Sequence, residues 1–353
     1  MANTKFSGDT GYRGVVKLGK THNTSNSTDL VILLATSGQF NQNHNPIFSS
    51  GDWGAGYMNI SEQVAYANNI IRVEGSMGME VTAGDGFTAM RNFALINRGS
   101  DKGTYIVIFP NGLHGFQGFG WCTSLSFSMS QDAILTADMN WSSYIDGSNN
   151  TITTGESDNS AYGSAGSDGL PFDYNGLFPY WGSSVTAIAG SNSRVDDVMS
   201  WSAEYSSSLE MLKCCGTTNA QGDALLSTQD PNADGKNSQA PVAPDYLGLG
   251  PMSATCSLEI FKLGQDFDFN KFHHAKGFEF SVKSPAENTE HKILLPKVIC
   301  NSNSSQIQTG TGWVTASFQY QAIGDGKGAP MDIDRDGTGG DGGSSDPATG
   351  NGE

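Results

Sequence analysis

Two segments of the sequence place oxygen-bearing side chains at positions 1, 3 and 5 and a Gly at position 6, as the start of an EF-hand calcium loop does. They are Asp230, Asn232 and Asp234 before Gly235, and Asp332, Asp334 and Asp336 before Gly337. Position 12 of such a loop carries a bidentate Glu, but here it holds Pro241 or Gly343. Solvated acids are therefore the default interpretation of both segments, and structural calcium is the alternative.

The cysteines give neither a zinc pattern nor a clear disulfide framework, because none of them forms a CxxC pair and their number is odd. Reduced thiols buried in strands are the default interpretation. Cys214 and Cys215 are adjacent, so in a strand they point to opposite faces and one of them is placed to meet a partner. A disulfide between subunits is the alternative for that pair. The full set is Cys122, Cys214, Cys215, Cys256 and Cys300.

The histidines and serines form no catalytic constellation. His114 lies in the Gly-rich segment 111–120, which we expect to be a loop. His273 and His274 are adjacent on a predicted helix, where they point about 100° apart and do not converge on a metal ion. No G-x-S-x-G elbow precedes a helix. The sequence therefore predicts no catalytic residue, no cofactor-binding residue and no metal ligand, and we do not expect an enzyme.

Strands dominate the elements that would position these groups. An amphipathic helix is predicted over 86–95, because four apolar residues from Phe87 to Ala94 have the i, i+3, i+6, i+7 spacing of one helical face. The segment 37–56 is rich in Gly, Asn and Pro and is expected to be irregular, and 60–66 has no clear pattern. Strands of the first half are predicted at 15–18, 30–35, 77–82 and 104–110.

A hairpin with one buried face is the clearest local prediction. Leu125, Phe127 and Met129 alternate with serines over 124–130. After the polar break at 131–132, apolar and polar residues alternate again as far as Trp141. Strict alternation on both sides of a short break is typical of antiparallel strands that cover a core with one face.

The second half follows the same order of elements as the first. A short helix is predicted over 266–275, and the strand that contains Pro296 is expected near a sheet edge or a bulge. We interpret the repeated order, strand, short helix, strand and hairpin, as an ancient duplication. Strands of the second half are predicted at 199–205, 254–261, 278–282, 293–300 and 314–320.

Polar segments divide the chain. Residues 146–169 are Ser, Asn, Gly and Asp with almost nothing apolar, which favours a linker. We expect the Gly- and Asp-rich tail to be disordered in isolation. The predicted divisions are a β module over 1–146, a linker over 147–169, a β module over 170–323 and a flexible tail over 324–353.

The composition excludes several classes of function. Only 16% of the residues are charged, and 19 basic against 36 acidic side chains give a net charge of −17. A protein this acidic does not bind a phosphate backbone by neutralising it, since that requires clustered Lys and Arg. The amino-terminal segment lacks the apolar core of a signal peptide, and no run of about 18 apolar residues is long enough for a membrane span. We therefore expect no membrane partner.

Three stretches resemble the tail-tube proteins of long-tailed bacterial viruses in their larger, duplicated form. The first is LLATSGQFNQNHNPIFSSGDWGAG, where a strand breaks into an NPI segment. The second is LFPYW with DDVMSWSAEYSSSLEML, where a Pro-aromatic-Trp turn precedes a strand with a Ser-Trp-Ser core. The third runs from GPMSATCSLEIF through GFEFSVKS and ILLPKV to GWVTASFQYQAI. The resemblance is one of element order and pattern over most of 30–323.

The resemblance implies a mainly β fold of two tandem β-barrel or β-sandwich modules, each with one short flanking helix. It implies a virion protein, assembled in the host cytoplasm, that forms homo-oligomeric rings around a lumen through which DNA passes without specific binding. A trimer with pseudo-sixfold symmetry is favoured over a hexamer, and other tail proteins are expected partners. Contacts between stacked rings are expected at 37–58 and 217–243.

Two alternatives remain open from the residues. A hub or adaptor at a tail end has the same fold but forms a single ring. A β-sandwich carbohydrate-binding module would use exposed aromatic rings as stacking platforms, and the candidates are Trp53, Trp121, Tyr180 and Trp181. Glycan binding predicts that these rings line an open groove, whereas a tube subunit buries them in its modules or at subunit contacts.

Overall fold

A computed structural model describes most of the strands of the chain. The described residues are 15–19, 30–43, 46–48, 64–66, 70–82, 84–95, 103–110, 114–146, 149–154, 177–182, 198–212, 243–262, 277–283, 290–307, 314–323 and 330–333. The predicted second helix at 266–275, nearly all of the loop 217–243, and Cys214 and Cys215 lie outside these ranges.

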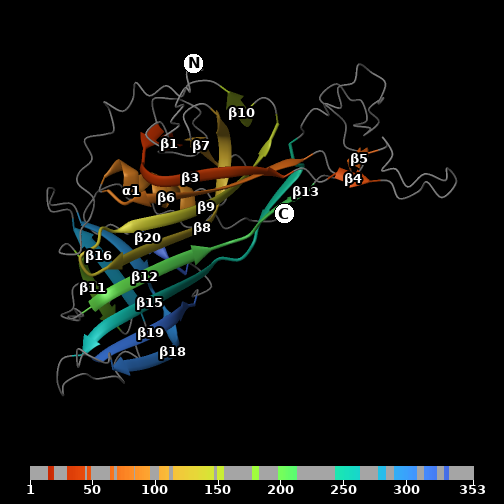
Figure 1. The fold of residues 1–353 in the computed structure, drawn as a ribbon. Helices are drawn as coiled ribbons and strands as arrows, with labels where there is room; N and C mark the ends of the chain where they lie inside the picture. Colours follow the sequence, from red (N-terminus) through yellow and green to blue (C-terminus); the bar gives the residue numbers. More distant parts are fainter. Residues whose placement is uncertain are drawn as a thin grey trace, which may run out of the picture.

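A twelve-stranded antiparallel sheet forms the body of the molecule (Figure 1). Eight of its strands pair in one continuous row that contains segments from both halves of the chain. In order across the sheet they are β3 (Leu34–Asn43), β6 (Ile71–Glu80), β9 (Thr136–Ile145), β8 (His114–Ser130), β12 (Val198–Ser206), β15 (Ser253–Lys262), β19 (Val314–Ala322) and β18 (Val298–Ile307).

The long strand β8 belongs to two sets of partners. Its second part forms the predicted hairpin with β9 and pairs with β12 on the other side. Its first part, which includes the Gly-rich segment expected to be a loop, pairs with β7 (Thr104–Phe109) and β10 (Thr151–Thr154). β7 continues the sheet to β1 (Val15–Gly19) and β2 (Leu30–Ile32).

The Gly residues of this segment permit close packing rather than a loop, which corrects the sequence prediction. A Cβ at Gly120 would lie 2.5 Å from Ile106 Cδ1, and one at Gly115 would lie 2.5 Å from the Phe109 ring. Gly is therefore required where neighbouring side chains cross the strand.

A smaller four-stranded sheet packs against the large one. Its order is β11 (Leu177–Gly182), β16 (Gly277–Lys283), β17 (Glu290–Leu295) and β20 (Asp332–Ile333). The predicted turn at 177–181 is thus the edge strand β11. The predicted strand 293–300 is two strands in different sheets, because the chain bends at Pro296 and Lys297.

Residues 330–333 of the expected disordered tail are described, and two of them form β20 of this small sheet. Met331 and Ile333 are fully buried, and β20 pairs with β17 through Ile333 and Asp332. The apolar, polar, apolar order of these residues matches the period of a strand, although the surrounding composition hides it. Residues 149–154 of the expected linker are also described, and Asp146 accepts hydrogen bonds from the backbone of Asn149 and Asn150 before β10.

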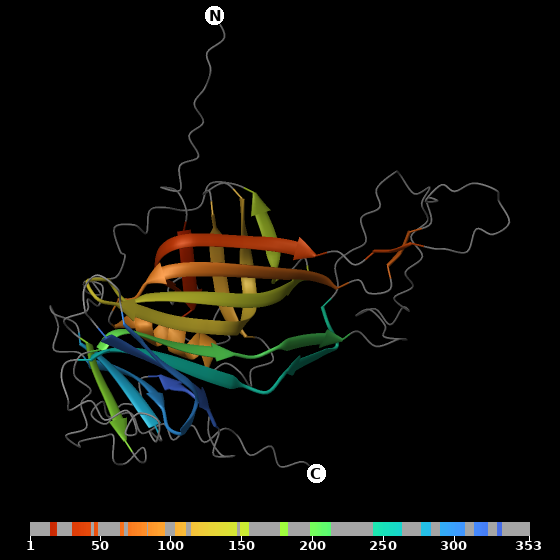
Figure 2. The ribbon, with the colours of Figure 1, turned by 60° about the horizontal axis from the view of Figure 1, so that its bottom comes forward.

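A short helix, α1 (Asp85–Ala94), lies under the large sheet (Figure 2), and it confirms the predicted helix over 86–95. Phe87, Met90, Phe93 and Ala94 are all buried in one core that includes side chains from both halves of the chain. The large sheet and the small sheet meet in this core, where the rings of Trp201 and Phe280 stack 4.3 Å apart. No helix in the described ranges has the length and apolar character that a bilayer crossing requires.

Two small strand pairs lie at one end of the large sheet (Figures 1 and 2). The first joins β4 (Pro46–Phe48) to β5 (Val64–Tyr66), and it stands away from the body beyond the end of β3. The second joins β13 (Leu209–Leu212) to β14 (Tyr246–Leu249) beyond the end of β12. β3 itself continues through 37–43, the first part of the segment 37–56 that was expected to be irregular.

The strand pairings of residues 15–154 recur in the same order in residues 177–333. In the first half β3 pairs with β6, β6 with β9, and β9 with the second part of β8. In the second half β12 pairs with β15, β15 with β19, and β19 with β18. The pairings of β1, β7, the first part of β8, and β10 likewise match those of β11, β16, β17 and β20.

The match extends to single residues. The pairing of β8 with β9 shifts between Cys122 and Ser124, and that of β18 with β19 shifts between Cys300 and Ser302. At both places the Cys Sγ donates a hydrogen bond to the Ser carbonyl, over 3.3 Å and 3.5 Å. β3 and β12 have matching shifts, between Ala35 and Ser37 and between Val198 and Ser200. β-bulges are kept within a protein family, so two halves that arose by duplication are expected to share them. The recurrence of these bulges therefore supports the predicted duplication.

Candidate functional site

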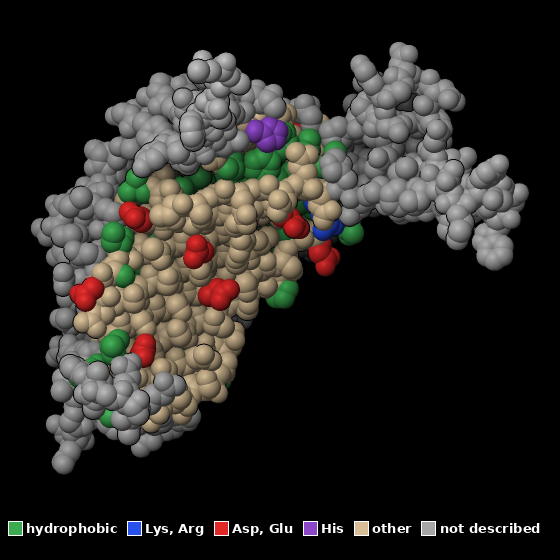
Figure 3. All heavy atoms as spheres, in the orientation of Figure 1, with side chains coloured by type: hydrophobic (Ala, Val, Ile, Leu, Met, Phe, Trp, Pro, Cys, Tyr) green, Lys and Arg blue, Asp and Glu red, His purple; other side chains and the backbone are tan. Residues whose placement is uncertain are grey.

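The face of the large sheet that is turned away from the core is the most distinctive surface of the molecule. Alternation sends Leu125, Phe127 and Met129 of β8 into the core and leaves the intervening serines on the outer face. The same alternation on the neighbouring strands makes a face of Ser, Thr, Asn and Gln. Figure 3 shows it as a broad, mainly polar surface with separate acidic groups. We call it the polar face, and it continues without interruption from first-half strands to second-half strands.

Hydrogen bonds between neighbouring strands satisfy many side chains of the polar face. Hydroxyl pairs lie 2.7 Å apart at Ser202 and Ser257 and at Ser206 and Ser253. Other pairs join Ser128 to Thr136 at 2.9 Å, Asn140 to Ser124 at 2.7 Å, Ser200 to Glu259 at 3.1 Å and Ser302 to Gln319 at 3.1 Å. The donors and acceptors of these pairs are matched within the sheet, so they are not free to bind a polar ligand.

The charges of the polar face are almost all negative. Among its described side chains, Arg72 is the one cation, and it donates a hydrogen bond to the Met211 carbonyl over 3.3 Å at the start of β6. A phosphate backbone that touches this face therefore meets repulsion rather than neutralisation. The carboxylates are Glu74, Glu80, Asp138, Glu204 and Glu259.

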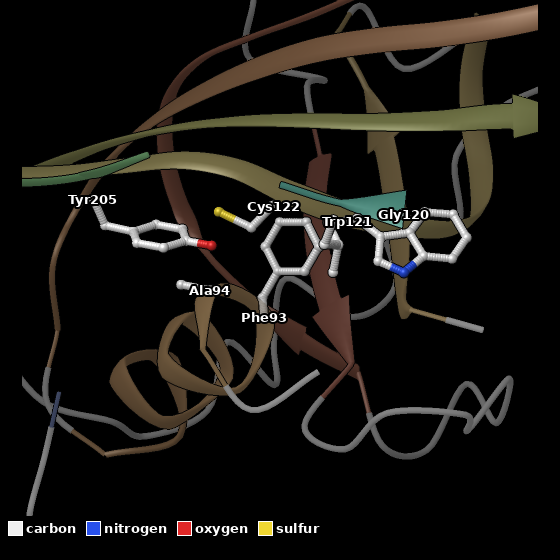
Figure 4. A pocket seen from close by; sticks show the side chains of 7 residues that line it. Phe93, Ala94, Gly120, Trp121, Cys122 and Tyr205 are labelled. Carbon is white, nitrogen blue, oxygen red and sulfur yellow. The ribbon is translucent and has the colours of Figure 1, made fainter. Parts of the chain in front are cut away.

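A small pocket lies behind the polar face where the two halves of the chain meet (Figure 4). α1 contributes Phe93 and Ala94, β8 contributes Trp121 and Cys122, and β12 contributes Tyr205. Gly120 and Leu249 complete the described lining, which contains no carboxylate and no imidazole. Its titratable side chains are Tyr205 and Cys122, and burial holds the Cys122 thiol in the neutral form.

The buried thiols are held in the neutral form. Burial is the largest influence on the Cys122 thiol and raises its pKa. Burial also raises the pKa of Cys256, with a smaller contribution from nearby Cys300. A nucleophilic or metal-binding Cys needs the thiolate, so these two residues act as small apolar side chains.

The raised thiol pKa values predict that the fold loses stability in alkaline solution. Above the ordinary thiol pKa of about 8.5, an unfolded chain releases protons that the folded chain retains, so rising pH favours unfolding. We expect a loss of about 2 kcal/mol per buried thiol by pH 10. Denaturant unfolding under reducing conditions at pH 7, 8.5 and 10 measures it. The Cys256→Ala variant serves as the control and should lose about half of the slope, and an unchanged slope would contradict the assignment.

The structure places the residues that the sequence analysis singled out at separate positions. His114 begins β8 and is exposed, with its ring centroid 6.0 Å from that of Phe40. Trp121 is 3% exposed, so its ring is not presented as a platform for a sugar. Asp332 lies on β20, while its companions Asp334 and Asp336 lie outside the described residues, as do Asp230, Asn232, Asp234 and Trp53. Of Tyr180 and Trp181 only the strand β11 is described.

One buried polar contact was not predicted. His291 of β17 is 5% exposed, stacks on Phe87 of α1 with centroids 4.4 Å apart, and accepts a hydrogen bond from the Gly84 backbone over 3.2 Å. It joins the first-half helix to the second-half sheet. No local pattern signals this contact, because Gly84 and His291 are 207 positions apart in the chain.

The two edge strands of the eight-strand row have one partner each within the described part of the chain. Among the described strands, β3 pairs only with β6, and β18 pairs only with β19. Each edge also carries an exposed large apolar side chain, Leu34 at 43% and Ile299 at 55%. An open strand edge is a template for pairing with another chain, which natural proteins otherwise block or cover. The two edges and the polar face together form the candidate assembly surface.

Neither a known protein-family model nor a curated protein matches this chain.

Proposed function

We propose that this protein is a self-assembling wall subunit, the tail-tube protein of a bacterial virus, which forms stacked rings around a passage for DNA. The observation that carries the proposal is the polar face. It extends over eight paired strands, holds five carboxylates and one cation among its described side chains, and satisfies many of its hydroxyl groups internally. Such a surface lets a phosphate backbone slide past, because it repels the phosphates. Each Lys or Arg contact would instead bind a phosphate and slow the movement of the DNA.

The recurring strand pairings support a chain of two tandem modules. We infer that residues 15–154 and 177–333 each form one module. Each module contains half of the eight-strand row, which we call the wall, and a second set of paired strands beside it. Inside the chain the modules already join edge to edge, through β8 and β12. A ring of such subunits needs half as many chains as modules, which agrees with the trimer that the family resemblance implies.

The small strand pairs at one end of the sheet support stacking. β4 with β5 and β13 with β14 occupy matching places, between β3 and β6 and between β12 and β15. In Figure 2 both extend past the same end of the wall strands. We propose that these pairs contact the next ring, where their exposed residues, such as Leu212 at 58% and Tyr246 at 63%, become buried.

Negative-stain electron microscopy of the purified protein at rising concentration tests the proposal. We expect hollow rings that stack into tubes, because each subunit carries both the wall and the stacking pairs. A matched variant, Leu212→Asp with Tyr246→Lys, should form rings that stack poorly. The two residues lie opposite each other on β13 and β14, and opposite charges there keep the strand pair together. Leu212 and Tyr246 are both exposed in the isolated chain, so the fold should tolerate the change.

The alternatives have distinct outcomes in the same experiment. Closed rings that never stack in the unchanged protein would identify a hub or adaptor rather than a tube. A protein that remains monomeric at high concentration, and stays so when a tail-tip extract or preformed tubes are added as initiator, would contradict the wall subunit altogether. Sizing by analytical ultracentrifugation in parallel separates small closed rings from monomers.

A further inference from the structure

The two edge strands of the eight-strand row have no second partner among the described strands. The pairing that joins the two halves of the chain shows how equivalent strands can pair. The second part of β8 pairs antiparallel with β12, and this pairing joins the two halves. The counterpart of β8 in the second half is β18, because both pair with the last wall strand of their half and both have a bulge after a Cys. The counterpart of β12 in the first half is β3. These counterparts, β18 and β3, are the two open edges.

We propose that β18 of one chain pairs antiparallel with β3 of a second copy, in the register that β8 and β12 use within the chain. The inference rests on the proposed self-assembly and specifies its contact surface. The matching bulges fix the register. Ser124 corresponds to Ser302, and Ser200 corresponds to Ser37.

The internal pairs then translate directly into pairs between chains. Glu204 lies opposite Ser126 inside the chain, which places Asn41 opposite Ser304 of the neighbour. Tyr205 lies opposite Leu125, which places Gln42 opposite Asn303. Ser206 lies opposite Ser124, which places Asn43 opposite Ser302. None of the three proposed pairs brings two like charges together, which would destabilise neighbouring strands.

The burial of corresponding residues supports a missing partner at both edges. Trp121 and Cys122 of β8 are 3% and 4% exposed, whereas their counterpart Ile299 is 55% exposed and Cys300 is half-buried. On the other edge, Val198 of β12 is 5% exposed, whereas its counterpart Ala35 is exposed. The same strand positions are thus covered at the internal junction and uncovered at the ends. A second copy of the chain supplies what covers them.

The pairing is head to tail, since β3 and β18 are different strands. A β3 to β3 or β18 to β18 contact would give an isolated twofold dimer and would leave the other edge of each chain open. The head-to-tail contact repeats the internal junction, so every wall strand gains a partner on both sides once the ring closes.

Disulfide trapping tests the register. In a background with Cys214, Cys215 and Cys300 replaced by Ser, one chain carries Asn41→Cys and a second carries Ser304→Cys, and the two are mixed under mild oxidation. Residues directly opposite one another have Cβ atoms about 5 Å apart, whereas diagonal residues are about 7–8 Å apart. Disulfides need Cβ atoms about 4 Å apart, so the direct pair is favoured. We expect a covalent dimer at least fivefold more abundant than with the diagonal pair, Asn41→Cys with Ser302→Cys.

Two controls make the result specific. Glu204→Cys with Ser126→Cys in one chain has the same geometry at the internal junction and should form an intramolecular disulfide without an increase in mass. This control reports whether that register position accepts a disulfide at all. Each single-Cys chain oxidised alone reports on twofold β3 to β3 or β18 to β18 contacts, and we expect little dimer from either.

The outcomes separate this inference from the proposed function. Rings in the microscope together with a dominant diagonal cross-link, or with dimers of one single-Cys chain, would overturn the register and leave the wall subunit standing. Monomers that give no cross-link while the internal control reacts would overturn both. A dominant Asn41 to Ser304 link in particles that never form tubes would support the edge pairing and contradict the tube.

Discussion

Replacing Gly75 by Cys should cost about 2–3 kcal/mol of the free energy of unfolding, one of the largest effects of a single small substitution in this chain. Gly75 of β6 lies opposite Trp141, whose ring crosses directly over it. A Cβ at position 75 would lie 2.4 Å from the Trp141 ring and 2.7 Å from the Gln39 carbonyl, so the ring or the edge strand must move. Denaturant unfolding of the purified variant measures the loss.

The second half of the chain contains the equivalent contact, in which a larger strand residue faces a smaller aromatic ring. There Cys256 occupies the position of Gly75, and it lies opposite Tyr320 in the position of Trp141. The smaller ring leaves room for the larger strand residue. We therefore expect Trp141→Tyr to destabilise the fold alone and to recover part of the loss when it is combined with Gly75→Cys. The coupling energy should be favourable by about 1–2 kcal/mol.

Additive losses in the double variant would contradict the size compensation and would weaken the residue-level match between the two halves. Gly75→Cys with Trp141→Phe is a useful companion variant, because Phe116 stacks on Trp141 with centroids 5.1 Å apart and any aromatic ring retains part of that contact. Similar recovery with Tyr and Phe would assign the effect to ring size rather than to the Tyr hydroxyl.

Replacing Glu74, Glu204 and Glu259 of the polar face by Lys should convert a surface that does not bind DNA into one that binds it. Each replacement removes a repulsive charge and adds a cation on the outer face of the wall. Three phosphate contacts give a salt dependence in which raising the salt from 50 to 200 mM weakens binding by about 40-fold. Gel-shift titration of duplex DNA at both salt concentrations measures the gain, which should be at least tenfold at low salt.

The matched control replaces the same three residues by Gln, which removes the negative charge without supplying a cation. We expect little binding by this variant, since the neighbouring hydroxyl groups of the face are paired with one another. In assembled particles the Lys variant should also bind more tightly than it does when dispersed, because the cations of several subunits then surround one duplex. Tight DNA binding by the unchanged protein would contradict a passage that lets DNA slide.

Local pattern in the sequence determined the elements that depend on local rules. The apolar spacing from Phe87 to Ala94 predicted α1 to within a residue, and the alternation around residues 131–132 predicted the hairpin of β8 and β9. Strands β7, β12, β15, β16 and β19 were also predicted near their observed bounds. In β12, β15 and β19 one face is buried and the other is polar, so the period of the side chains records the structure, whereas β7 is recognised by its β-branched and aromatic residues.

Contacts in the tertiary structure decided the elements that the local amino-acid composition did not predict. The Gly-rich start of β8 is a strand because neighbouring side chains need the space above each Gly, and β20 forms in an acidic segment because Met331 and Ile333 fit into a core built elsewhere in the chain. The contact of His291 with Phe87 and Gly84 has no local signature at all.

The same distinction applies to the candidate assembly surface: local pattern in the sequence predicted one part of it, and tertiary contacts decided the other. The sequence by itself determined that most strands have a polar, weakly charged side, since alternation and charge are properties of short segments. It did not determine which strands are neighbours. The antiparallel pairing of β8 with β12, and the open edges at β3 and β18, follow from contacts between residues far apart in the chain. Strand order is a property of the packed core, which only the folded chain specifies.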